Sequence, residues 1–175
     1  MKKITLPISL LLVISASLFL PSSANAANTG WRYWGYFQAA PGATQWTAAM
    51  TGPTVNVKNG SVEGWAFTFS GDVIPDAATP IIAPSFKSIC GQTKAVKNKK
   101  RIGLVIDFGP KSIRPDGEVA PKTMTRCVVV PINALGIDVL GKVAKIRANA
   151  SGLICGIRHF PLKECGVEIP TPATL

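Results

Sequence analysis

Aromatic residues are concentrated in the N-terminal third of the chain that follows its apolar leader. All four tryptophans and both tyrosines lie between Trp31 and Trp65, and the segment from Trp31 to Phe69 holds nine of the twelve aromatic residues outside the leader. The run from Trp31 to Phe37 places rings on both sides of a period-two strand, which is more ring area than one side of a small sheet needs. This segment is therefore either the main packing centre of the protein or its ligand-binding face.

The aromatic residues divide into two groups by their neighbours in the sequence. Trp65, Phe67 and Phe69 share one side of a predicted strand, and we expect them to form core, because rings dominate core burial. A second group lies beside glycine, arginine or polar residues, where a flat ligand such as a sugar or a macrocycle could stack. The candidate ligand- or partner-binding residues are Trp31, Trp34, Tyr36 and Trp46, with burial in the core as the alternative.

The first 26 residues have the pattern of a secretory signal peptide. A cationic start is followed by the apolar stretch 4–20 and by Ala24-Asn25-Ala26, which supplies the small residues that a signal peptidase requires. A membrane anchor is the alternative, but the apolar stretch is short for a span and Pro21 follows it at once. We expect cleavage after Ala26 and an extracellular protein, either released or held at the cell surface by a partner.

The predicted mature chain, 27–175, has the length of one domain with a true core. The full chain carries 19 basic and 9 acidic residues, and loss of Lys2 and Lys3 would leave a charge of +8. In an exported protein this charge favours anionic wall polymers, lipid headgroups or an acidic partner over nucleic acid.

The four cysteines predict two disulfides, because an even number in an oxidising compartment is typical of paired thiols. Three connectivities are open in principle, but the short segment between Cys155 and Cys165 contains glycine and proline and closes easily. We therefore pair Cys155 with Cys165 and Cys90 with Cys127. A zinc site is not expected, because the chain has no CxxC pair and a single histidine.

Local patterns predict an α+β domain that is mainly β-sheet, with one main helix. Asn59-Gly60 favours a type I′ hairpin turn, and Pro131 can begin a helix. The predicted hairpin strands are 54–58 and 61–69, the predicted helix is 131–144, and further strands are expected at 101–108, 127–130, 145–148 and 153–157.

No residue pattern indicates catalysis, so we expect a protein that is not an enzyme and has no cofactor. His159 is predicted to lie in a surface loop and Asp107 to serve as a turn or capping residue, while Glu63 lies in the predicted hairpin. Nucleophile elbows, P-loops and dinucleotide fingerprints do not occur. Four basic residues, Lys97, Lys99, Lys100 and Arg101, are expected to lie in a solvated loop. The alternative is that they form a weak anion-binding patch.

Two resemblances to known proteins follow from motifs along the chain. Tyr33-Trp34, Val62 to Trp65, Phe86 to Cys90, Lys100 to Gly109, Ser151 to Ile157 and Pro161 to Cys165 match segments of a family of small, secreted, uncharacterised actinobacterial proteins. The chain resembles this family over nearly its whole mature length. The resemblance implies a context near energy-coupling-factor uptake systems of the cobalt or corrinoid type.

The second resemblance is to the β-grasp-like C-terminal module of cobalamin carriers, with the two halves in reverse order. The Tyr33-Trp34 strand and the segment 59–65 come first here, and the segments 127–144 and 152–157 come last. This resemblance implies a circularly permuted β-grasp stapled by disulfides.

Together these features predict a secreted, non-enzymatic binding module. Its aromatic face would meet a small ligand, such as a corrinoid, or a component of an envelope uptake system. The alternative is a basic structural or interaction protein of the cell envelope, with its charge on wall polymers and every tryptophan in the core.

Overall fold

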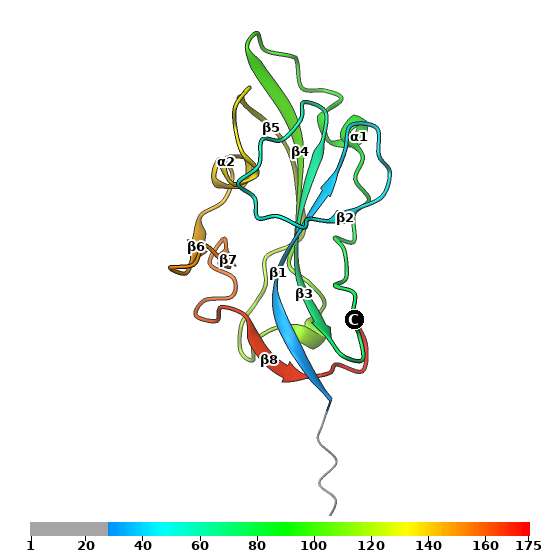
Figure 1. The fold of residues 1–175 in the computed structure, drawn as a ribbon, viewed down its shortest axis with the longest axis vertical. Helices are drawn as coiled ribbons and strands as arrows, with labels where there is room; N and C mark the ends of the chain where they lie inside the picture. The colour runs from blue at the N-terminus through cyan, green and yellow to red at the C-terminus, as the bar shows by residue number, and fades with distance from the viewer. Residues whose placement is uncertain (1–27) are drawn as a thin grey trace, which may run out of the picture.

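A six-stranded mixed sheet runs the length of the molecule (Figure 1). This computed structural model describes residues 28–175, so the predicted signal peptide at 1–26 lies outside the described residues. Only β3 and β4 are parallel neighbours; the other pairs are antiparallel. In spatial order the strands are β2 (Thr47–Ala48), β1 (Thr29–Ala39), β3 (Val62–Gly71), β4 (Lys99–Asp107) and β5 (Met124–Pro131), and β8 (Val167–Pro170) also pairs with β1.

Short elements cover the two faces of this sheet. In Figure 1, α2 and the small two-stranded sheet lie on one side of the long strands and α1 lies on the other. These elements are α1 (Phe86–Cys90), the 3₁₀ turn η1 (Lys111–Ile113), α2 (Gly136–Gly141), β6 (Ile146–Ala148) and β7 (Ile154–Ile157). The prediction of a small, mainly β-sheet domain with few helices is therefore confirmed.

The predicted hairpin around Asn59-Gly60 is wrong. The turn itself forms, with the Ser61 N–H donating to the Lys58 carbonyl over 3.1 Å, but only Gly60 has a positive φ, as in a type II turn. Segment 54–58 is not a strand, and β3 pairs instead with β1 and β4. Strand β1 is the better partner because it places Trp34 opposite Phe67, so two large rings pack across the strands.

The main core lies on the sheet face that α2, β6 and β7 cover. Trp34 packs edge to face against Phe67, with ring centroids 5.7 Å apart, and against Phe108 at 5.4 Å. Phe160 closes this ring cluster from the segment after β7, at 5.1 Å from Phe67. The expectation that Trp65, Phe67 and Phe69 are core residues is confirmed, since all three are buried.

The opposite face carries a smaller core beneath α1. Val62 and Val105 lie at its centre, and Trp46 and Phe86 pack against them. Helix α1 begins at Ser85, whose side chain accepts from the Ser88 N–H at 3.2 Å. This helix was not predicted, because five residues are too few to show a helical period.

The predicted helix at 131–144 is correct in place and wrong in length. Pro131 is the last residue of β5, and the Asp138 carboxylate accepts from the Leu135 N–H at 2.8 Å, so the helix begins only at Gly136. A proline can start a helix, but here the ladder of β5 extends through it. Leu140 is fully buried, as its place in the predicted apolar stripe requires.

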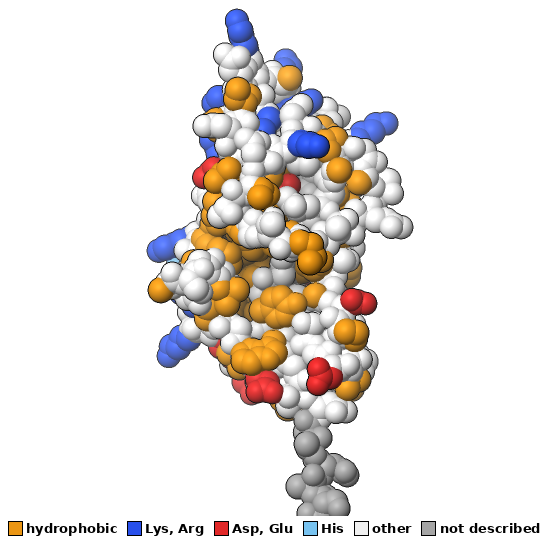
Figure 2. All heavy atoms as spheres, viewed as in Figure 1, with side chains coloured by type: hydrophobic (Ala, Val, Ile, Leu, Met, Phe, Trp, Pro, Cys, Tyr) orange, Lys and Arg blue, Asp and Glu red, His pale blue; other side chains and the backbone are white. Residues whose placement is uncertain are grey.

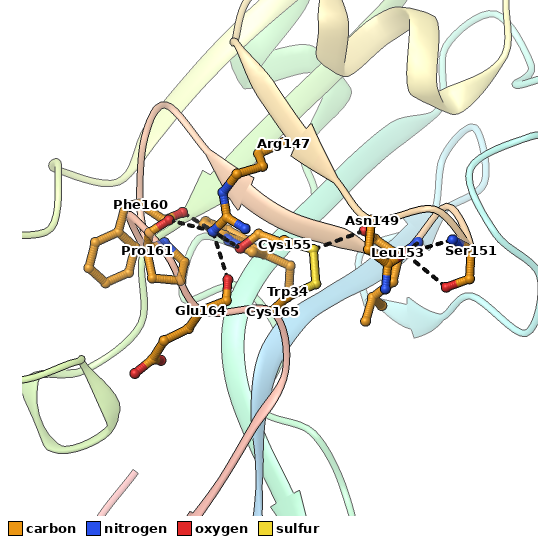
Figure 3. Close-up of a disulfide and its surroundings, with 10 residues drawn as sticks. All are labelled: Trp34, Arg147, Asn149, Ser151, Leu153, Cys155, Phe160, Pro161, Glu164 and Cys165. Carbon is orange, nitrogen blue, oxygen red and sulfur yellow. Dashed lines mark hydrogen bonds between the residues drawn. A yellow bond between two sulfur atoms is a disulfide. The ribbon is translucent and has the colours of Figure 1, made fainter.

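Both predicted disulfides are present. Cys90–Cys127 links α1 to β5, and Cys155–Cys165 links β7 to the segment that leads into β8 (Figure 3). Paired cysteines are consistent with an extracellular protein. Within residues 28–175, no helix is long and apolar enough to cross a membrane.

Candidate functional site: an aromatic cleft

A cleft of about 410 Å³ opens over β1 and β3, and we refer to it as the aromatic cleft. Trp34, Tyr36 and Trp65 form its floor, and the segments 49–53 and 151–154 form its walls. Figure 2 shows hydrophobic side chains gathered in this hollow, between the part of the surface that carries β6 and β7 and the rest of the molecule.

The floor follows from the register of β1 and β3. Tyr36 lies opposite Trp65, and their rings stack with centroids 4.7 Å apart and planes 23° apart. Trp34 and Trp65 expose only 4% and 1% of their surface, whereas Tyr36 is half-buried. A ligand in the cleft would therefore meet the accessible ring of Tyr36 and only the edges of the packed Trp34 and Trp65 rings.

Hydrogen bonds fix both walls of the cleft. The Ala49 N–H donates to the Tyr36 carbonyl at 2.9 Å, and the Ile137 N–H donates to the Pro53 carbonyl at 2.8 Å, so segment 49–53 is held at both ends. On the other wall, the Asn149 side chain accepts from the backbone N–H groups of Ser151 and Leu153, each at 3.0 Å (Figure 3). The cleft is thus preformed.

The rim of the cleft is apolar. The Met50 side chain is 95% exposed on one wall, and Leu153 is exposed on the other. The methionine side chain is unbranched, flexible and polarizable, so it can adapt its shape to an apolar partner. None of the described residues that line the cleft is charged.

Trp65 carries a buried hydrogen-bond donor without an acceptor. The indole Nε1–H of Trp34 donates to the Phe160 carbonyl at 3.1 Å, but within the described part of the chain no acceptor lies in reach of Nε1 of Trp65. Most buried donors are satisfied, and an unsatisfied one is destabilising. A donor left unpaired in a residue that lines a cleft is the kind of group that a ligand acceptor can satisfy.

A buried polar cluster adjoins the floor. The Tyr36 hydroxyl donates to the Glu63 carboxylate, which also accepts from Gln38 Nε2 at 3.1 Å and Ser61 Oγ at 3.3 Å. Glu63 is 1% exposed, and burial raises its pKa above the ordinary value, although the three donors and the charge of Lys100 oppose this shift. Burial, followed by the charge of Glu63, raises the pKa of Tyr36.

The prediction that Lys100 belongs to a solvated basic run is wrong. Lys100 is 4% exposed, and its Nζ donates to Asn56 Oδ1 at 2.9 Å and to the carbonyls of Val57 at 2.6 Å and Ala134 at 2.8 Å. Burial lowers its pKa, because the neutral amine needs less solvation. The ammonium ties the segment before β3 to the segment before α2.

The structure separates the four predicted binding residues. Trp34 and Tyr36 line the aromatic cleft. Trp31 is 53% exposed on the opposite side of β1, three residues from Trp34 in a period-two strand. Trp46 packs under α1 on the far face, where its Nε1 donates to the Ile82 carbonyl at 3.0 Å.

Other residues of the cleft were not predicted. Trp65 was assigned to the core alone, although its place opposite Tyr36 puts it in both core and cleft. Met50 and Leu153 lie in loops distant in sequence, and no local pattern marks them. The odd spacing of Trp31 and Trp34 was the one available signal that they face opposite ways.

Asp107 lies at the end of β4 and His159 lies in a turn. Asp107 accepts from the N–H groups of Ile81 at 2.7 Å and Gly109 at 3.1 Å, which confirms it as a turn and loop anchor. His159 lies exposed in a turn, as predicted. Over the part of the chain that the structure describes, no three histidine, cysteine or acidic side chains are grouped to hold a metal ion.

Comparison with known proteins gives one match. The search of curated proteins and the search of solved structures found nothing similar to this chain. A family model, the SCO2322-like domain, matches residues 26–170, which includes both sheets, both disulfides and the aromatic cleft. The chain therefore belongs to the SCO2322-like domain family.

Proposed function

We propose that this protein is a secreted, non-enzymatic binding module that holds a flat, uncharged group of a small ligand in the aromatic cleft. The observation that carries the proposal is the Nε1–H of Trp65, which has no acceptor among residues 28–175 and belongs to a residue that lines a preformed cleft. The volume of about 410 Å³ lies within the range of small-molecule sites.

The lining specifies the chemistry of the ligand. Tyr36 offers a partly accessible ring, and Met50 and Leu153 offer apolar contacts from the two walls. A charged group would lose its hydration there without gaining an ionic partner. The best fit is a planar, apolar group with one acceptor that meets the Trp65 N–H.

A corrinoid is the first natural ligand to test, because of the resemblances to proteins near cobalt or corrinoid uptake systems and to a cobalamin-carrier module. Only an edge or a side group of such a macrocycle would enter the aromatic cleft, and the rest would contact Met50 and Leu153 at the rim. The permuted β-grasp arrangement and the link to an envelope uptake system belong to this proposal.

Calorimetric titration of the mature protein with quinoline and with naphthalene tests the proposal. The two probes have the same shape, but only quinoline has a nitrogen that can accept a hydrogen bond. Cobinamide is titrated in parallel as the corrinoid. We expect saturable binding that favours quinoline, and loss of this preference in Trp65→Phe, which keeps a ring and removes the N–H.

Exposed side chains provide a matched pair of variants. Met50→Ser should weaken binding, because it removes a rim contact, whereas Val119→Ser removes an equally exposed apolar side chain outside the cleft and should have no effect. Equal affinity of wild type and Met50→Ser for every probe would contradict the proposal.

A second candidate function is a basic interaction protein of the cell envelope, and the uneven distribution of charge favours it. Figure 2 shows lysine and arginine side chains at the upper end of the molecule, where the loop before β4 carries exposed Lys94 and Lys97 and β4 begins with exposed Lys99. Retention on cell-wall extract at low salt and release at moderate salt would support this function, because exposed charges are screened over about 10 Å at 0.1 M.

A further inference from the structure

We propose that a second cleft, beside β6 and β7, is a binding site for a phosphate group. This basic cleft has a volume of about 430 Å³, and Lys145, Arg147 and His159 line it together with Gly156 and Leu162. Among the described residues, no acidic side chain contributes to its lining. It shares no lining residue with the aromatic cleft, so the proposal stands independently of the proposed function.

Arg147 is held in place by the backbone around it. Its Nη2 donates to the carbonyls of Cys155 at 3.2 Å, Pro161 at 2.9 Å and Glu164 at 2.7 Å, as Figure 3 shows. A Cβ on Gly156 would lie 3.2 Å from the same nitrogen, so the absence of a side chain there lets the guanidinium approach.

This fixation leaves part of the guanidinium available. No described residue accepts a hydrogen bond from Nε or Nη1 of Arg147. An arginine held before the ligand arrives loses little conformational entropy on binding, and charge-assisted hydrogen bonds to phosphate are stronger than neutral ones. The basic cleft therefore contains a fixed cation with unused donors.

His159 is presented by a strained turn. The N–H and C=O groups of Ile157 and Phe160 bond each other at 2.9 and 3.1 Å, and both central residues, Arg158 and His159, have left-handed φ angles of 53° and 66°. Such two-residue turns favour glycine and asparagine, which adopt positive φ at less cost. Two bulky residues in this turn are unfavourable for folding, and the turn places the His159 side chain in the lining of the basic cleft.

Two acidic side chains near the basic cleft, Glu164 and Glu118, already have partners in the protein. The Glu164 carboxylate forms an ion pair with Arg32, and the Glu118 carboxylate accepts from the Leu162 N–H at 2.9 Å. Neither lines the basic cleft. A phosphate, with its negative charge and several acceptor oxygens, is therefore the ligand class that this lining fits.

Calorimetric titration of the mature protein with inorganic phosphate tests the site, with sodium chloride at matched ionic strength as the blank. Two variants each remove a hydrogen-bonding side chain of the cleft and preserve the backbone. His159→Asn removes the imidazole, and asparagine tolerates the left-handed region, while Lys145→Gln removes a positive charge. Lys142→Gln is the matched control, since it removes an exposed lysine outside the basic cleft. We expect each cleft variant to weaken binding by about two- to fivefold, the range of a partly exposed charge contact, and the control to leave it unchanged.

Flotation with vesicles identifies the source of the phosphate group. Weaker binding of the two cleft variants to phosphatidylglycerol vesicles, together with weaker phosphate binding, would assign the site to a lipid headgroup. Phosphate binding that depends on the cleft while vesicle binding does not would assign it to a free phosphate compound. The proposal is overturned if inorganic phosphate shows no saturable binding, or if Lys142→Gln weakens it as much as the cleft variants do.

Discussion

The Tyr36 hydroxyl donates a hydrogen bond to the Glu63 carboxylate, so one side chain joins the floor of the aromatic cleft to the buried polar cluster. The ring of Tyr36 stacks on Trp65, while its hydroxyl contributes to the solvation of a carboxylate that has lost its contact with water. A ligand in the cleft, as proposed, would therefore contact the same residue on which the ionisation of Glu63 acts, and the chemistry of Glu63 provides the first prediction.

The stability of the protein should fall as pH rises through the range in which Glu63 titrates. Burial raises the pKa of this carboxyl in the folded state above its ordinary value of 4.5, so the folded protein binds a proton more readily than the unfolded chain does. Protonation thus favours the fold, and this advantage is lost between pH 4.5 and the raised pKa. Denaturation midpoints measured across pH 4 to 8 should show this decline, and Glu63→Gln should abolish it. A decline of equal size in the variant would show that another group causes it.

Buried Lys100 should be far more important for stability than its exposed neighbour. Lys100→Met removes the donor that serves the carbonyls of Val57 and Ala134, and each buried acceptor left without a partner costs about 1–3 kcal/mol. We expect a loss of roughly 2–5 kcal/mol by urea denaturation. Lys99→Met, which changes an exposed side chain of the same strand, should shift the free energy of unfolding by less than about 0.5 kcal/mol.

The contribution of α2 can be measured with two residues of the same segment. Leu140 is fully buried in the main core, so Leu140→Ala should destabilise by about 2–5 kcal/mol. Lys142 is exposed just after the helix, and Lys142→Ala should be nearly silent in the same thermal and urea measurements. Small, equal effects at both positions would mean that the helix does not pack on the sheet.

Features that depend on local sequence are the ones that can be predicted. The strand predicted at 101–108 is an apolar run in the sequence, which is typical of a strand buried on both faces. The observed β4 lies between β3 and β5, as such a strand should. Cys155 and Cys165 are close in the chain, and pairing them leaves Cys90 and Cys127 as the other disulfide. An even number of cysteines and the short spacing of one pair are therefore enough to predict both disulfides.

Features that depend on long-range pairing could not be predicted in this way. Asn59-Gly60 favours a hairpin, but the aromatic residues of β1 form the stronger partner for β3, from about 30 residues earlier in the chain. Lys100 appears in a charged run, and only the approach of Val57 and Ala134 makes it a buried donor. The aromatic cleft has the same origin, because its walls come from segments 49–53 and 151–154, far apart in sequence.

The tryptophans should differ sharply in solvent access and in their contribution to stability. Trp34 is nearly buried and its Nε1 donates to the Phe160 carbonyl, so Trp34→Ala should cost about 3–5 kcal/mol. Trp31 is half exposed at the start of β1, so Trp31→Ala should cost under about 1 kcal/mol. Iodide should quench mainly the emission of Trp31, and Trp31→Phe should remove most of the quenched component while leaving the thermal midpoint almost unchanged. Trp46 is only partly buried, so the deciding variant also carries Trp46→Phe. If iodide still quenches this Trp31→Phe, Trp46→Phe variant as strongly as the wild type, then Trp34 or Trp65 is open to solvent and the aromatic cleft is wider than the structure places it.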